Sequence, residues 1–153
     1  MTKEEVDGVL LYQEIACGNR DAEMSLYHWT LFAHGIDDII DDYRDGKPVA
    51  AEQFIGVMAQ SCIAYTLPFY QQHSARLQPV VMAVTNMYAD SVKWERSGDP
   101  KFEAIADGIR SCGNELLSAV ALICGGYAHM RRMSPKLRHR SYEIQHDNAG
   151  NPI

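Results

Sequence analysis

Helical periodicity recurs in almost every segment of this chain, and this pattern limits the possible fold more than any other feature of the sequence. Apolar residues return every three or four positions between stops made by glycine and proline, which is the spacing of amphipathic helices. No segment of useful length alternates apolar and polar residues as a strand would. We therefore predict an all-α fold, a single-domain helical bundle of about five to six helices over residues 1–133.

Capping residues and helix breakers divide the pattern into segments. Thr2 and Glu5 have the spacing of a capping box, and Asp21 is a candidate cap for a second helix. Gly46 and Pro48 close that second helix. The expected helices cover about 2–16, 21–45, 50–68, 74–97, 99–126 and 127–133.

The overall composition indicates a soluble protein with one core. The 153 residues suffice for a single domain, and the net charge of -6 argues against general nucleic-acid binding. The longest apolar run, residues 116–124, is too short to span a bilayer, and the polar N-terminus does not read as a signal peptide. The four cysteines are scattered without a Cys-x-x-Cys pair, so we expect reduced, mostly buried thiols and a cytoplasmic location.

An acidic cluster marks the end of the second expected helix, where five aspartates stand within nine residues. Aspartates at helical neighbour positions repel one another, so they either face water or surround a cation. A helical wheel places them on one side together with His34, opposite the apolar side that we expect to face the core. The predicted core-facing residues are Trp29, Phe32, Ala33, Ile36, Ile39, Ile40 and Tyr43.

The acidic side of this helix continues towards the N-terminus through Met24, Tyr27 and Leu31. Three apolar residues there predict a helix buried on both sides, with the acids at the mouth of a bundle. Carboxylates crowded at such a place have to protonate or bind a cation. Oxygen ligands one helical turn apart suit Mg²⁺, which takes one or two carboxylates, waters and phosphate oxygens. His34, one turn before Asp38, is either a hydrogen-bond partner of a ligand or an ordinary polar residue.

The stretch DDIIDDYRDGKP resembles the first aspartate-rich motif of class I isoprenoid diphosphate synthases, the polyprenyl and terpene synthases. The resemblance implies an all-α bundle with a central cavity, in which Asp37, Asp38 and Asp41 bind Mg²⁺ and the metal binds a substrate diphosphate. Arg44 and Lys47 match the basic residues that follow the motif in that family, and they would bind phosphate. The match covers about fifteen residues, and no second Asp-Asp-x-x-Asp occurs. The stretch between the last aspartate and Gly-Lys-Pro is two residues shorter than is usual in that family, and the chain is much shorter than a full synthase.

A second segment, NMYADSVKWE at 86–95, partly matches the other metal motif of terpene cyclases. Ser91 and Glu95 have the required spacing, but Met87 stands at the first position. A helical wheel puts both residues on the inward stripe, where an acid needs a partner. A metal or a base shared with the second helix would supply this partner for Glu95, and Ser91 would then be a neighbour of the site. Alternatively, Glu95 lies at a frayed helix end and reaches water.

The C-terminal part of the chain is basic. We expect residues 134–153 to form a loosely structured basic tail. Arg131 and Arg132, just before it, could clamp a phosphate held at the acidic mouth. Two other interpretations of these basic residues remain open. They make a weak contact with nucleic acid, or they are solvated charges that balance the acidic body of the protein.

Three functions remain open from the sequence. The first is a Mg²⁺-dependent protein that binds or transforms a diphosphate-containing small molecule of the isoprenoid type. The second is an all-α nucleoside triphosphate pyrophosphohydrolase, although the paired glutamate motifs of that family are absent. The third is a non-catalytic helical scaffold or accessory protein. A homodimer would complete a cavity that half a bundle leaves open.

Overall fold

Six helices make up the part of the chain that the computed structural model describes, residues 3–145, with side-chain surroundings described for residues 8–142. No strand occurs within these residues, so the all-α prediction and the expected number of helices are confirmed. Thr2, the predicted first cap, lies outside the described residues. The helices are α1 (Lys3–Ala16), α2 (Arg20–Arg44), α3 (Ala51–Thr66), α4 (Pro68–Trp94), α5 (Pro100–Arg110) and α6 (Gly113–Gln145).

The chain divides into two compact units, residues 1–74 and 75–153. The division lies inside α4, next to His73, whose φ of -112° and ψ of 15° interrupt the helix. The sequence predicted a helix start at Ser74, and the helical run after this interruption does start there, although α4 as a whole begins at Pro68. Leu67 is extended, with ψ of 144°, as expected for a residue before proline, and the proline then occupies the first turn of the new helix.

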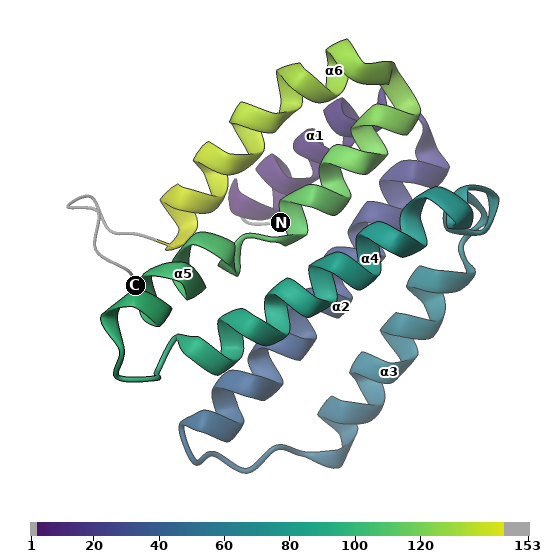
Figure 1. The fold of residues 1–153 in the computed structure, drawn as a ribbon. Coiled ribbons are helices and arrows are strands. Elements are labelled where there is room, and N and C mark those ends of the chain that lie inside the picture. The colour runs from purple at the N-terminus through teal and green to yellow at the C-terminus, as the bar shows by residue number, and fades with distance from the viewer. Residues whose placement is uncertain (1–2, 146–153) are drawn as a thin grey trace. The chain divides into compact units, whose positions relative to one another are not determined.

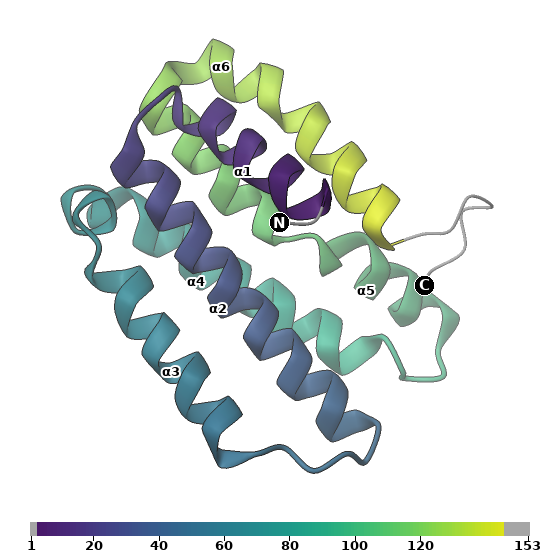
Figure 2. The same ribbon diagram turned by 180° about the vertical axis from the view of Figure 1, so that it is seen from behind.

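In the first unit, α2 packs along both α1 and α3 (Figure 2). The α1 contact includes a hydrogen bond from the Tyr12 hydroxyl to Thr30 Oγ1, 2.7 Å long. The α3 contact is close at Gly35, because a Cβ added there would lie 2.6 Å from Val57 Cγ2. Glycine at this position therefore lets the two helix backbones approach each other.

The ends of α2 follow local capping rules. The start differs from the prediction, because Asn19 and not Asp21 is the cap. Asn19 has an extended ψ of 103°, and its side-chain oxygen accepts the Ala22 N–H at 3.1 Å. At the other end, Gly46 adopts a φ of 69° and closes the helix, as predicted.

In the second unit, α5 begins as predicted and ends earlier than predicted. The Asp99 carboxylate accepts a backbone N–H of the first turn at 2.9 Å. The expected continuous helix over 99–126 is wrong, because α5 stops at Arg110 and a turn follows. The turn is tied to α4 by the Cys112 thiol, which donates to the Val84 carbonyl at 3.5 Å.

Helix α6 folds back on itself (Figure 1). The reversal occurs at Gly126, whose φ of 76° and ψ of -179° belong to a region that essentially only glycine adopts. Two contacts hold the arms side by side: Asn114 Nδ2 donates to Ser141 Oγ at 2.9 Å, and Arg138 pairs with Glu115 at 2.7 Å.

The predicted loose tail is wrong for residues 134–145, which form the last turns of α6. Leu137 is 2% exposed, and Met133 before it is 1% exposed, so this arm has a buried side. Burial at four-residue spacing explains why the basic segment is helical. Residues 146–153 lie outside the described residues.

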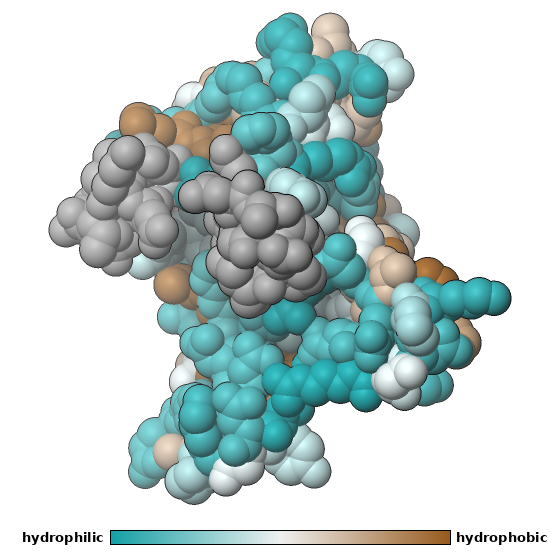
Figure 3. Space-filling model, turned by 90° about the vertical axis from the view of Figure 1, so that its left-hand side faces the viewer, coloured by the Kyte–Doolittle hydropathy of each residue, from teal (hydrophilic) through white to brown (hydrophobic). Residues whose placement is uncertain are grey.

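Hydrophilic side chains dominate the face of the molecule drawn in Figure 3, with isolated hydrophobic ones among them. None of the helices within residues 3–145 combines the length and the apolar character that a membrane crossing requires. The four cysteines lie within the described residues and form no disulfide there, but the prediction that they are mostly buried is wrong. Cys17 and Cys62 are exposed, Cys124 is half-buried and Cys112 is buried.

Candidate functional site

The N-terminal part of the α2 face that carries the acids is exposed. Met24, Tyr27 and Leu31 are 48%, 44% and 37% exposed, so the predicted second buried face is wrong. Tyr43, predicted to face the core, is 78% exposed. Helix α1 contacts α2 at Thr30, and α3 contacts it at Gly35 and at Asp42. Burial therefore does not force the acids to bind a cation.

The three aspartates of the predicted metal site occupy one stretch of α2. Asp37 and Asp41 are half-buried, whereas Asp38 and His34 are exposed. Within residues 8–142, the carboxylates of Asp38 and Asp41 form no hydrogen bond or ion pair, and neither does the His34 ring. The predicted hydrogen bond from His34 to a carboxylate is thus absent from the described residues. Two carboxylates one turn apart remain accessible from solvent.

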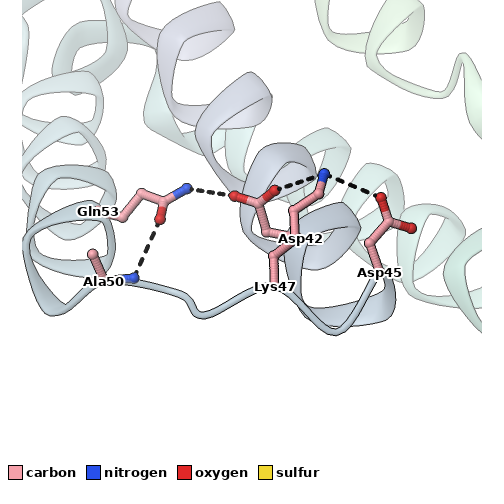
Figure 4. Close-up of polar contacts among 5 residues, drawn as sticks. All are labelled: Asp42, Asp45, Lys47, Ala50 and Gln53. Atoms are coloured by element: carbon pink, nitrogen blue, oxygen red, sulfur yellow. Dashed lines mark hydrogen bonds and ion pairs between the residues drawn. The ribbon is translucent and has the colours of Figure 1, made fainter.

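Lys47 ties the last acids of the cluster to the turn that follows (Figure 4). Its ammonium lies 3.4 Å from Asp42 Oδ1 and 3.2 Å from Asp45 Oδ2. The two carboxylates, Asp45 first, raise the pKa of Lys47 above its ordinary value. Lys47 thus neutralises part of the cluster, and binding a phosphate would require it to leave these carboxylates. Arg44, the other predicted phosphate ligand, is half-buried.

Gln53 continues this network into α3. Its amide nitrogen donates to Asp42 Oδ2 at 3.1 Å, and its amide oxygen accepts the Ala50 N–H at 3.3 Å. The hydrogen bond from Gln53 is the largest cause that lowers the pKa of Asp42, and Lys47 lowers it further. Asp42 is therefore held as a carboxylate by the α2–α3 turn.

No group of three His, Cys, Asp or Glu side chains in the described part of the chain is arranged to hold a metal ion. The acids at the end of α2 thus do not form a ready cage. Mg²⁺ does not require one, since it commonly keeps several waters and binds one or two carboxylates plus substrate phosphates. Asp38 and Asp41 fit that smaller requirement, whereas Asp42 and Asp45 are engaged with Lys47.

Glu95 and Ser91 belong to the second unit and have partners there. Glu95 forms an ion pair with Arg110 of α5, and its side chain is 16% exposed. The expectation that this acid needs a partner is met by a base on α5, not by one on α2. Ser91 is 1% exposed and donates to the Tyr88 carbonyl at 2.8 Å. Both side chains therefore have structural roles within this unit.

The two arginines proposed as a phosphate clamp also lie in the second unit, on the returning arm of α6. Both are exposed. Arg132 Nη2 lies 3.1 Å from Nδ1 of His129, which is 6% exposed. Since a guanidinium only donates, Nδ1 of this histidine is the acceptor. Arg131 is the more available of the pair for an external anion.

Sequence reasoning missed Gln53 and Arg110. The Gln53 side chain accepts the N–H of the cap residue Ala50, but alanine has no side-chain acceptor to return the bond, so the sequence lacks the capping-box signature that would have identified Gln53. Arg110 lies fifteen residues after Glu95, and only the α4–α5 turn brings them together. No local pattern indicates that pairing.

Comparisons of this chain with protein-family models, with curated proteins and with solved structures find no match.

Proposed function

We propose that this protein binds Mg²⁺ at the C-terminal half of α2 and, through the metal, the diphosphate group of a small molecule of the isoprenoid-diphosphate type. The proposal rests on the resemblance of this segment to the aspartate-rich motif of class I isoprenoid diphosphate synthases. The proposal concerns binding of the metal and of the diphosphate. The proposed ligands are Asp37, Asp38 and Asp41.

The observation that carries the proposal is the position of these acids on the helix. The C-terminal end of a helix has a partial negative charge, so carboxylates are disfavoured there. Nevertheless α2 places Asp41 in its last turn and Asp45 at its C-cap. A divalent cation would offset both the mutual repulsion of the acids and their conflict with the helix dipole. Lys47 offsets only part of this unfavourable charge, since it contacts Asp42 and Asp45.

The roles of the residues follow from this arrangement. The carboxylates of Asp38 and Asp41, which are accessible and one turn apart, would hold and orient the ion. When bound, Mg²⁺ supplies positive charge that neutralises and orients a diphosphate. Arg44 and Lys47 would neutralise the remaining phosphate charge, with Lys47 exchanging its carboxylate contacts for phosphate contacts. Glu95 is not required, because Arg110 is its partner.

A non-catalytic scaffold is the second candidate, and a different observation favours it. Large apolar side chains are exposed on α2 and α3, including Tyr27, Ile55 and Met58. Exposed apolar patches are typical of surfaces that bind other proteins. In this reading the acids are a solvated face, and the apolar side chains carry the function.

Thermal unfolding with Mg²⁺, and with Mg²⁺ plus pyrophosphate, tests the metal site. A ligand at about 100 times its dissociation constant adds roughly 2.7 kcal/mol, or roughly 5–10 °C in a chain of this size. We expect Mg²⁺ to raise the unfolding temperature, pyrophosphate to raise it further, and Asp38→Asn to remove both shifts. The matched control is Asp90→Asn, which removes the same charge from α4 outside the acidic cluster and should keep both shifts.

Either of two results would reject the proposed site. The first is the absence of a shift in the wild-type protein at millimolar Mg²⁺. The second is a shift that Asp38→Asn and Asp90→Asn reduce equally, because it would then follow total charge and not position. Either result would favour the non-catalytic scaffold.

A further inference from the structure

Helix α3 uses only one side to contact α2. Val57 packs at Gly35, the Gln60 side chain is 3.0 Å from His28 Nδ1, and Gln53 reaches the acidic cluster. These α3 positions are spaced three or four residues apart, so they lie on one face. The opposite face of α3 is available for another contact.

That opposite face is apolar and exposed. Ile55 and Met58 are 63% and 55% exposed, and Cys62 is exposed one turn further on. Glu52 is the only charged residue in the sixteen of α3. A helix that is apolar on both sides is typical of a helix buried on both sides. We define the α3 stripe as Ala51, Ile55, Met58, Cys62 and Thr66.

We propose that the α3 stripe is a homodimer interface, on which α3 of a second copy packs in antiparallel orientation. This inference is independent of the proposed metal site. The order of side chains along the stripe is self-complementary about a point between Met58 and Ala59. A two-fold axis there sets Ile55 opposite Cys62 of the second copy and Ala51 opposite Thr66 of the second copy. Larger side chains thus meet smaller ones, and the adaptable Met58 lies next to the axis.

Charge favours a second copy in this orientation. Each chain carries a net charge of -6, so a surface with little charge limits the repulsion between two copies. In the antiparallel arrangement, the two Glu52 residues are about 20 Å apart along the helix axis, from a rise of about 1.5 Å per residue. That separation exceeds the Debye length of about 8 Å at physiological salt. A parallel arrangement would bring the two carboxylates together and align the helix dipoles unfavourably.

The oligomeric state in solution tests the interface. Sedimentation equilibrium at about 100 μM should give twice the 17.2 kDa chain mass, with dissociation on dilution. Met58→Lys places two like charges next to the axis and should weaken the dimer at least about tenfold, with unchanged helical content. The matched control is Met82→Lys, on α4, where the methionine is 63% exposed; this variant should remain dimeric.

A disulfide test determines the register. Ile55→Cys in a Cys17→Ser background should oxidise to a covalent dimer, because residue 55 would face Cys62 of the second copy. Adding Cys62→Ser should abolish the cross-link. Residues 55 and 62 of one helix are about 10 Å apart and cannot pair within a chain. A monomeric wild-type protein, a dimer that survives Met58→Lys, or a cross-link that survives Cys62→Ser would each overturn the proposal.

Discussion

At the scale of single residues, Gly35 sets the distance between α2 and α3. Alanine has a higher helix propensity than glycine, so Gly35→Ala would stabilise an isolated helix. Here the new Cβ would lie 2.6 Å from Val57 Cγ2, which is closer than two non-bonded carbon atoms can approach. The overlap forces the helices apart or Val57 out of its rotamer, and such overpacking typically costs about 1–3 kcal/mol.

We therefore expect Gly35→Ala to lower the free energy of unfolding by about 1–3 kcal/mol, measured by urea denaturation. The control is Gly108→Ala on α5, where a Cβ has no atom within 4 Å and the change should stabilise by up to about 1 kcal/mol. Val57→Ala should restore part of the lost stability when combined with Gly35→Ala. If Gly35→Ala stabilised the protein as Gly108→Ala does, the close α2–α3 contact would be disproved.

At the scale of elements, the sequence predicted what depends on a few neighbouring residues. The Asp99 cap with Pro100, and the closure of α2 at Gly46, follow from local backbone chemistry. The break between α5 and α6 was not predicted, because the two residues that form it, Ser111 and Cys112, are not helix breakers. Its tie to the Val84 carbonyl is made across 28 residues, which no local pattern reveals.

The aromatic cluster of the first unit gives a prediction about alkaline pH. The Tyr65 ring contacts Trp29, Phe32 and Tyr70 edge-on, with ring centroids 5.5, 6.2 and 5.1 Å away. Burial, and secondarily the nearby Tyr70, raise the pKa of Tyr65 from 10 to about 12. The folded state thus keeps its proton between about pH 10 and 12, where the unfolded chain has lost it. Stability is retained below about pH 10 and falls as the pH rises to 12.

Two measurements check this expectation. Phenolate absorbance of the folded protein should show a tyrosine that titrates near pH 12, and Tyr65→Phe should remove it. The free energy of unfolding should fall less steeply above pH 10 in Tyr65→Phe than in the wild type. Tyr43→Phe is the control, because its ring is 78% exposed and its removal should leave the late component unchanged. A late component that persists in Tyr65→Phe would assign the high pKa to another residue.

At the scale of the whole molecule, the helical class was predictable, but the exposed faces were not. Periodicity indicates which residues share a face, and it does not indicate whether anything covers that face. Met24, Tyr27 and Leu31 were therefore expected to be buried, and they are exposed. The same limit applies to the acids, whose accessibility depends on helices distant in the sequence. The contact of Lys47 with Asp42, five residues before it, is by contrast local in the sequence.

The net charge of -6 affects stability in two ways that ionic strength can separate. Screening by any salt weakens repulsion among the acids, and it depends only on ionic strength. Occupation of a site depends on the concentration of Mg²⁺ itself. We therefore expect millimolar MgCl₂ to raise the unfolding temperature above that in NaCl of equal ionic strength. Asp41→Asn should remove this difference and retain the rise that both salts share. Equal unfolding temperatures in the two salts would mean that the aspartates of α2 act only as a collective charge, and Mg²⁺ would then have no specific place on this helix.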